Sequence, residues 1–311
     1  MNQREQKTSP LRSALIGLLL CAAPVLAHAA DRVEPPGKPA RLISVDGAVT
    51  EILYALGAEE QLVGVDTTSL YPAATEDVAK VGYKRALSAE GILSLQPDLL
   101  LATDDAGPPE VLEQIARAGV NTHRIPDTAT VAGLHETIAA VAEVLERAEA
   151  GAALSAQLDQ ELAQLEAATE ANRSRPRVLF LLHIGSGNDL AAGRDTAADT
   201  VIRLAGGENV LHDAFSGYKP LSAEAALAAA PDAILVTQRN LEQLGSLDAV
   251  LERGALKATP AGQARRVLAM DGPLLLAFGP RLAVAAAQLA CDLGLIDREN
   301  YERSELTAGQ P

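Results

Sequence analysis

Tyr83 and Arg85 are the two residues whose types and spacing most suggest metal-ligand chemistry. They stand two positions apart, and in an extended segment the side chains at i and i+2 lie on the same side, so the guanidinium can reach the phenol oxygen. A fixed cation beside a phenol favours the phenolate form. A phenolate is a hard anionic ligand that suits Fe(III). The pair therefore indicates a site for a ferric ligand, and a packing tyrosine whose hydroxyl finds a partner is the alternative interpretation.

The sequence lacks the motifs of the common enzyme classes. The Gly-Ser-Gly turn at 185–187 is not followed by the third glycine of a dinucleotide loop or the Lys-Ser/Thr pair of a phosphate loop. There is no Gly-x-Ser-x-Gly elbow, and Cys291 lies within an expected helix, so no nucleophile is visible beside a base. The histidines show no metal-ligand spacing, and no calcium-type loop occurs. We therefore expect a binding protein and not an enzyme.

A duplicated segment dominates the sequence. Ser88–Thr103 (SAEGILSLQPDLLLAT) and Ser222–Thr237 (SAEAALAAAPDAILVT) share eight of sixteen residues, and their lead-ins GYKRAL and GYKPL also agree. A separation of about 130 residues is too long for a solenoid repeat, so the duplication indicates two similar lobes built on one plan. A cleft between two lobes is a common place for a ligand.

Expected strands and helices alternate on both sides of a long helical segment, which is typical of α/β lobes with largely parallel sheets. Residues 131–172 are rich in Ala, Leu, Glu and Gln and contain no proline, so they predict two helices that separate near Glu149–Gly151. The second helix, about Ala152–Ala171, would be about 30 Å long and would join the lobes as a stiff rod. The expected strands are Arg41–Val45, Gln61–Val65, Leu99–Thr103, Asn121–Ile125, Arg177–Leu182, Ala233–Thr237 and Arg266–Met270, and the other expected helices are Thr50–Leu56, one from Ala89, Glu110–Ala118, Thr196–Leu204 and Pro280–Leu293.

The N-terminal residues predict export. Three basic residues precede an apolar run at 14–26 and the triplet Ala-His-Ala at 27–29, which is the pattern of a secretory signal peptide and is too short for a membrane span. A lipid-modified Cys21 is the alternative, but such a cysteine normally follows a small residue, and this one follows Leu20. We expect a signal peptide (1–29), an N-terminal α/β lobe (30–148), a linking helix (149–173) and a C-terminal α/β lobe (174–311).

The composition of the mature chain agrees with this division. Cleavage leaves one cysteine, Cys291, so we expect no internal disulfide. Cleavage also changes the formal net charge from −15 to −17, which makes nucleic acid and anionic membrane surfaces poor partners.

Several motifs carry a family resemblance: GYKRALSAEG (82–91), Gly-Pro-Pro at 107–109, GYKPLSAE (217–224), and Met-Asp-Gly (270–272) followed by Phe-Gly-Pro-Arg (278–281). With them the sequence resembles the periplasmic haemin-binding proteins of bacterial haem ABC importers, within the class III family that also carries cobalamin and siderophores. The resemblance covers essentially the whole mature chain. It implies two Rossmann-like lobes joined by a single long helix, and a haem iron ligated by Tyr83 with Arg85 holding its oxygen.

The same resemblance nominates three further residues for contact with haem. His183, after a strand of the second lobe, is a candidate second iron ligand that would face Tyr83 across the cleft, and a structural histidine is the alternative. Arg239 is a candidate partner for a propionate, or else a solvated loop residue. Tyr71 is a candidate to stack on the porphyrin, or else part of a Tyr-Pro turn.

Glu90 and Glu224 occupy the same place in the two copies, two residues after the probable N-caps Ser88 and Ser222. A carboxylate in the first helical turn complements the helix dipole, which is the structural explanation. Two matching carboxylates would also suit a basic pocket presented twice by a homodimeric membrane partner. The resemblance implies this docking on a permease.

Together these features predict a periplasmic carrier that binds ferric haem b in the inter-lobe cleft and delivers it to an ABC permease with its ATPase subunits. It would act as a monomer, would not insert into the membrane, and would move its lobes little because the linking helix is stiff. A carrier of cobalamin or a ferric siderophore on the same scaffold is the nearest alternative. A periplasmic enzyme that processes haem or an iron chelate is the alternative from another class.

Overall fold

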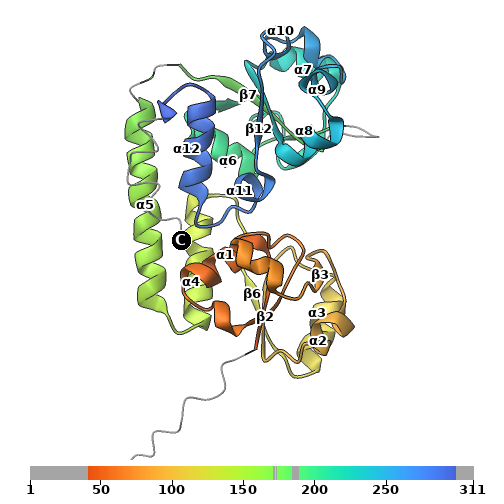
Figure 1. Cartoon of the computed structure of the whole chain (residues 1–311), viewed down its shortest axis with the longest axis vertical. Coiled ribbons are helices and arrows are strands. Elements are labelled where there is room, and N and C mark those ends of the chain that lie inside the picture. Colours follow the sequence, from red (N-terminus) through yellow and green to blue (C-terminus); the bar gives the residue numbers. More distant parts are fainter. Residues whose placement is uncertain (1–40, 171, 173, 184–188, 299–311) are drawn as a thin grey trace, which may run out of the picture. The chain divides into compact units, whose positions relative to one another are not determined.

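The computed structural model describes residues 41–170, 172, 174–183 and 189–298 (Figure 1). The predicted signal peptide (1–29) and the Gly-Ser-Gly turn (185–187) lie outside these ranges. Residues 39–311 belong to one compact unit. Within the described ranges, no helix combines the length and the apolar character needed to cross a bilayer.

The N-terminal lobe is built on a parallel sheet with the strand order β2-β1-β5-β6. β1 and β5 are buried along their whole length, because both faces of the sheet are covered and successive side chains point to opposite faces. Helices α1 and α4 cover the face that carries Leu42 and Leu101, and α2 and α3 cover the face that carries Ile43 and Leu100. The elements are β1 (Leu42–Val45), α1 (Gly47–Ala55), η1 (Glu59–Gln61), β2 (Leu62–Val65), η2 (Ala73–Asp77), β3 (Gly82–Tyr83), β4 (Ala86–Leu87), α2 (Ala89–Ser94), β5 (Leu99–Thr103), α3 (Pro109–Arg117), β6 (Asn121–Ile125) and α4 (Val131–Val144).

The C-terminal lobe contains a larger, mixed sheet with the order β10-β8-β7-β11-β12 and with β9 beside β7. β7, β11 and β12 are parallel, whereas the pairs β7–β8 and β8–β10 are antiparallel. Helices α6 and α12 cover the face of Phe180 and Leu235, and α7 and α9 cover the face of Leu181 and Val236. The elements are β7 (Arg177–His183), β8 (Leu190–Ala192), α6 (Ala197–Leu204), β9 (Glu208–Asn209), β10 (Tyr218–Pro220), α7 (Ala223–Ala229), β11 (Ala233–Thr237), α8 (Gln238–Leu244), α9 (Leu247–Leu251), η3 (Leu256–Ala258), α10 (Pro260–Gln263), β12 (Val267–Met270), α11 (Gly272–Leu276) and α12 (Leu282–Asp292).

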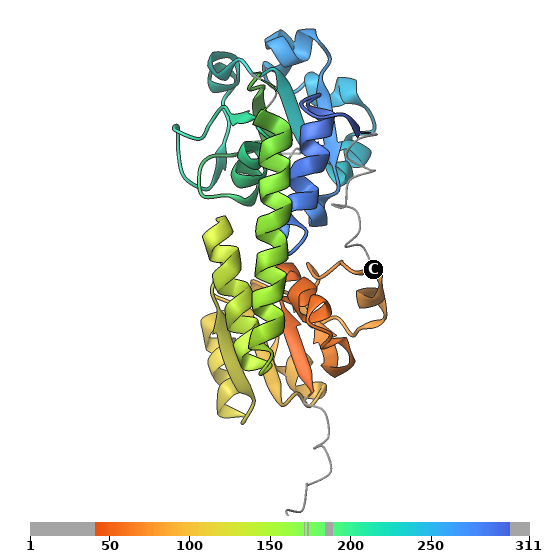
Figure 2. The same cartoon turned by 90° about the vertical axis from the view of Figure 1, so that its left-hand side faces the viewer.

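The long helix α5 (Ala148–Glu170) links the two lobes. Its 23 residues make it about 35 Å long at 1.5 Å per residue. It packs against α4 of the N-terminal lobe and α12 of the C-terminal lobe (Figure 2). Leu158 and Leu165 of α5 are buried in a hydrophobic core that includes residues of both sheets. The fold is therefore the predicted one, with two α/β lobes joined by one long helix.

The predicted helix break near Glu149–Gly151 is wrong. The chain turns at 145–147, where Glu146 has a left-handed φ of 56°, and Gly151 is buried inside α5. A Cβ atom at Gly151 would lie 2.4 Å from the Cβ of Ala142 in α4. This glycine therefore allows two helices to approach closely, and it does not end a helix.

The two copies of the duplicated segment fold alike. Ser88 caps α2 by accepting a hydrogen bond from the amide of Gly91, and Ser222 caps α7 by accepting one from the amide of Ala225. The strand that follows is central in each sheet: β5 pairs with β1 and β6, and β11 pairs with β7 and β12. The duplication therefore corresponds to equivalent parts of the two lobes, as predicted.

Candidate functional site

Tyr83 lies on a small hairpin outside the main sheet of the N-terminal lobe. β3 and β4 pair antiparallel, with Tyr83 opposite Ala86. Gly82 has a φ of +103°, and its carbonyl accepts a hydrogen bond of 2.9 Å from the amide of Thr67. Tyr83 is 45% exposed, which is unusual for a large, mostly apolar side chain. Its phenol is therefore accessible to a ligand.

Arg85, on the turn of the same hairpin, donates to Asp105. Its Nε and Nη2 lie 3.1 and 2.6 Å from Asp105 Oδ2. The hydrogen bond with Asp105 is the largest cause of a raised pKa of Arg85, and interactions with Tyr83 contribute less. The guanidinium, on the same hairpin as the Tyr83 phenol, is thus held by the Asp105 carboxylate. The sequence predicted Arg85 beside Tyr83, and Asp105 was not among the predicted site residues.

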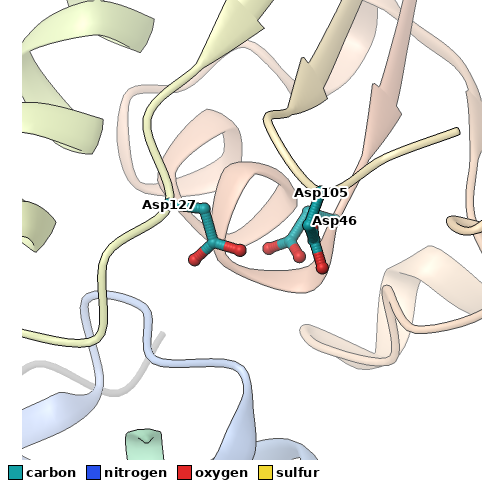
Figure 3. Close-up of side chains that lie close together, drawn as sticks. All are labelled: Asp46, Asp105 and Asp127. Carbon is teal, nitrogen blue, oxygen red and sulfur yellow. The ribbon is translucent and has the colours of Figure 1, made fainter. Parts of the chain in front are cut away.

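Lys84 points into the lobe from the residue between Tyr83 and Arg85. Its Nζ lies 2.7 Å from Asp46 Oδ2, 3.0 Å from Asp105 Oδ1 and 3.7 Å from Asp127 Oδ2. Figure 3 shows these three carboxylates gathered together, and one oxygen from each lies within 4.8 Å of the others. Such a group could hold a metal ion, but here the Lys84 ammonium supplies the positive charge. We therefore assign an ion-pair cluster and not a metal centre.

The cluster changes the acidity of its members in different directions. Burial raises the pKa of Asp46 to about 6, although Lys84 opposes this. Burial also acts to raise the pKa of Asp105, but hydrogen bonds from Arg85, Lys84 and Thr103 outweigh it and lower the value to about 2. Asp105 is therefore a stronger acid than Asp46, and Asp46 takes up a proton more readily than Asp105.

His183 and Arg239 lie together in a groove with a volume of about 620 Å³. His183 is the last residue of β7, and its side chain is exposed. Arg239 is also exposed, but the alternative that it is a loop residue is wrong: it lies in the first turn of α8, which Thr237 caps directly after β11. The groove is lined by Leu70, Leu182, His183, Thr237, Gln238, Arg239, Asn240, Glu242, Gln243, Asp271, Gly272, Pro273 and Leu276.

One loop connects the tyrosine hairpin to this groove. The amide of Thr67 binds the carbonyl of Gly82, and Leu70, three residues further on, is the groove residue that comes from the N-terminal lobe. Tyr83 and Arg85 themselves are not among the lining residues. In both lobes the candidate residues follow the carboxyl ends of parallel strands or lie over them, which is where α/β folds bind ligands.

Tyr71 packs against a contact between the lobes. The guanidinium carbon of Arg281 lies 3.4 Å from the centre of the Tyr71 ring. Arg281, just before α12, also forms a two-bond ion pair with the buried Glu51 of α1, at 3.0 and 2.6 Å. One face of the Tyr71 ring is thus already covered by Arg281 and is not open for stacking on a ligand.

Glu90 and Glu224 are exposed in the first turns of α2 and α7. Each follows its serine cap by two residues, so the two carboxylates occupy equivalent corners of the two lobes. The predicted pair of matching acidic positions is therefore present on the surface.

Two features of the site escaped sequence reasoning. The Lys84 cluster could have been anticipated, because Asp46, Asp105 and Asp127 each lie one or two residues past the carboxyl end of an expected strand, and such ends meet at one edge of a parallel sheet. No sequence pattern indicated that Leu70 would line the groove, since it belongs to an irregular loop.

The fold and the site define a two-lobed α/β substrate-binding protein. Residues 42–274 match the family model described as periplasmic binding protein, and the chain belongs to this family. The vitamin B12-binding protein of Pectobacterium atrosepticum is 26% identical over 281 residues, which cover 90% of this chain and 93% of that protein.

Two solved structures are more similar in sequence. The periplasmic haem-binding protein RhuT from Roseiflexus sp. RS-1, in its apo form, is 40% identical, with a TM-score of 0.79 over 82% of this chain and 98% of that one. The periplasmic haem-binding protein BhuT, in complex with two haems, is 43% identical, with a TM-score of 0.77 over 82% of this chain and 97% of that one.

Proposed function

We propose that this protein is a periplasmic carrier that binds ferric haem b through Tyr83 and delivers it to an ABC permease. The observation that carries the proposal is the exposed Tyr83 phenol with the Arg85 guanidinium beside it, on a hairpin at the ligand-binding edge of the fold. The similarity to haem-binding proteins at 40% and 43% identity supports haem as the cargo.

The chemistry of the site suits carriage of oxidised haem. Tyr83 would supply an anionic oxygen to the iron, and Arg85 would favour that anion by its charge. An oxygen ligand of this kind stabilises Fe(III) and lowers its reduction potential. The haem would therefore travel in an oxidised form that does not bind oxygen, and the protein would release it chemically unchanged.

The groove on the C-terminal lobe would hold the rest of the ligand. Arg239 is suited to pair with a propionate, because a guanidinium forms strong, directed bonds with a carboxylate. His183 is a candidate second iron ligand from the opposite lobe. Leu70 and Leu276 offer apolar contacts to a porphyrin face. Tyr71, with one face against Arg281, would contribute only the other face.

Titration of the mature protein with ferric haemin and, separately, with cyanocobalamin tests the choice of ligand. We expect haemin to bind with a shifted Soret band and cobalamin not to bind at the same concentration. Recovery of unaltered haem from the complex would agree with a carrier. Tight cobalamin binding without haemin binding would overturn the proposal, and conversion of the haem to another product would support an enzyme.

Cobalamin is the second candidate, and one observation favours it. The vitamin B12-binding relative covers 90% of this chain. A corrinoid already carries its own axial ligands, so its binding would not depend on a phenolate. The dependence of binding on Tyr83 therefore separates the two candidates.

We also propose that Glu90 and Glu224 dock on the permease. Both are exposed on equivalent helix starts, and a homodimeric permease presents the same basic pocket twice. The double charge reversal Glu90→Lys, Glu224→Lys should stop uptake in a reconstituted importer while haemin affinity stays at the wild-type value. Unchanged uptake would contradict the docking role.

A further inference from the structure

Three consecutive residues of the tyrosine hairpin point in alternate directions. Tyr83 is 45% exposed, the side chain of Lys84 is 13% exposed, and that of Arg85 is 60% exposed. Tyr83 lies in β3, and Lys84 and Arg85 form the two-residue turn of the hairpin. The turn and the ion pairs of Lys84, and not strand alternation, therefore set which of these side chains face outward.

Lys84 is held from several directions at once. Asp46, Asp105 and Asp127 follow β1, β5 and β6, so one ammonium connects the hairpin to three strands of the sheet. The backbone adds a further bond, because the carbonyl of Lys84 accepts a hydrogen bond of 2.9 Å from the amide of Gly107. Turning the hairpin over would leave the buried Asp46 carboxylate without its cation, which is strongly unfavourable.

The second copy of the same tripeptide shows the opposite arrangement. In Gly217-Tyr218-Lys219 the tyrosine faces inward, with its ring 6.5 Å from that of Phe180, and Lys219 is exposed with its Nζ 5.6 Å from the Phe215 ring. The tripeptide alone therefore does not decide which residue faces outward. The two lysines lie in different settings, because Lys84 is in a turn beside three carboxylates and Lys219 is within β10.

We propose that Lys84 is a positioning residue for the ligand: its ammonium, bound by Asp46, Asp105 and Asp127, keeps Tyr83 and Arg85 on the outer face of the hairpin. Lys84 does not itself touch the ligand. The inference rests on the proposed role of Tyr83 and extends it to a residue that faces away from the ligand.

The expected effect of removing the Lys84 ammonium follows from the fraction of molecules in which Tyr83 faces outward. If only a fraction of molecules holds Tyr83 outward, the apparent dissociation constant rises by the reciprocal of that fraction. A competent fraction of about one tenth would weaken haemin binding about tenfold. A porphyrin without iron does not need the phenolate, so its affinity should stay close to that of the wild type.

The test measures binding of ferric haemin and of iron-free protoporphyrin IX to the wild-type protein, Lys84→Met and the matched control Lys219→Met. We expect Lys84→Met to bind haemin at least about tenfold more weakly, with a Soret band altered toward that of Tyr83→Phe, and to bind protoporphyrin within about twofold of wild type. Lys219→Met should match wild type for both ligands. Circular dichroism establishes that each variant is folded.

The outcomes separate this inference from the proposed function. If the Lys84→Met variant does not fold because its three carboxylates repel one another without a cation, Lys84→Gln replaces it. Lys84→Gln keeps hydrogen-bond donors, and the same results are expected for it. Unchanged haemin binding, or an equal loss for both porphyrins, would overturn the positioning role while Tyr83→Phe still showed Tyr83 to be the ligand. A wild-type protein whose haemin spectrum did not respond to Tyr83→Phe would instead overturn the proposed function.

Discussion

The two lobes use the same duplicated sequence for different purposes. In the N-terminal lobe, Tyr83 belongs to a separate hairpin beside a fully parallel sheet, and its phenol is exposed. In the C-terminal lobe, Tyr218 belongs to β10, which extends the main sheet through β8. Burial there raises the pKa of Tyr218 to about 12, so its phenol stays neutral. The Tyr83 side chain is thus exposed, whereas the Tyr218 ring is partly buried and packs against the core.

The surroundings of the repeated motif differ between the two lobes. The N-terminal lobe places acidic residues under Lys84, and the C-terminal lobe places aromatic rings beside Tyr218 and Lys219. The C-terminal lobe in turn provides the groove with His183 and Arg239. We therefore expect each lobe to contribute a different part of the ligand site.

The largest effect on stability should distinguish the two tyrosines. Tyr218→Ala removes a ring packed against Phe180 and should lower the free energy of unfolding by about 3 kcal/mol. Tyr83→Ala removes an exposed ring and should change it by about 0.5 kcal/mol or less. Urea denaturation of both variants measures these values. Equal losses would show that Tyr83 is also a packing residue.

A pair of glycines tests how tightly the chain packs beside one strand of each lobe. A Cβ at Gly193, just after β8, would lie 2.1 Å from the backbone oxygen of Phe215, whereas a Cβ at Gly64 in β2 would lie 2.7 Å from a methyl group of Leu95. Backbone atoms move aside less easily than the end of a side chain. Gly193→Ala should therefore lower the free energy of unfolding by about 2–3 kcal/mol, and Gly64→Ala should lower it by about 1 kcal/mol. Thermal unfolding measures both, and the reverse order would contradict the close packing of β8 against the segment before β10.

The helix caps should behave alike in the two lobes. Ser88→Ala and Ser222→Ala each remove one hydrogen bond to a helix amide and should each lower the free energy of unfolding by about 1 kcal/mol. Haemin affinity should not change in either variant. A lower free energy of unfolding in only one of the two variants would show that the two copies are not equivalent at this position.

A further effect on stability concerns the pH dependence of the Lys84 cluster. The pKa of Asp46 is raised from 3.8 to about 6 by burial, so the folded state holds a proton that the unfolded state releases. Between these values the folded state binds more protons, and stability from this group therefore increases as the pH falls from about 6 to about 4. Wild type should gain stability relative to Asp46→Asn over this range. A constant difference between them would contradict the raised pKa.

The longer elements were predictable because their patterns are strong. The buried runs of β1, β5, β7 and β11 and the long helix α5 were each predicted within a few residues of their bounds. The sequence does not reveal the strands β3, β4, β8, β9 and β10, since two or three residues carry too little pattern to recognise. The duplicated segment correctly predicts that the two copies occupy equivalent parts of two similar lobes.

Other features depend on contacts between distant parts of the chain. Gly151 was taken for a helix break, although its role depends on how close α4 comes to α5. Thr237 ends β11 and caps α8 at the same time, so the sequence suggested a loop at Arg239. The opposite facing of Tyr83 and Tyr218 could not be predicted from two identical tripeptides, because it depends on which residues lie beneath each one.

The most direct test of the account is a titration of Tyr83→Phe and Tyr218→Phe with ferric haemin, followed by absorbance. Both changes remove one hydroxyl, and only the first removes an exposed one. We expect Tyr83→Phe to lose the wild-type ferric spectrum and to bind about 100-fold more weakly, a loss of about 2.7 kcal/mol, while Tyr218→Phe matches wild type. A Tyr83→Phe variant that keeps the wild-type spectrum and affinity would contradict the claim that this phenol binds the iron.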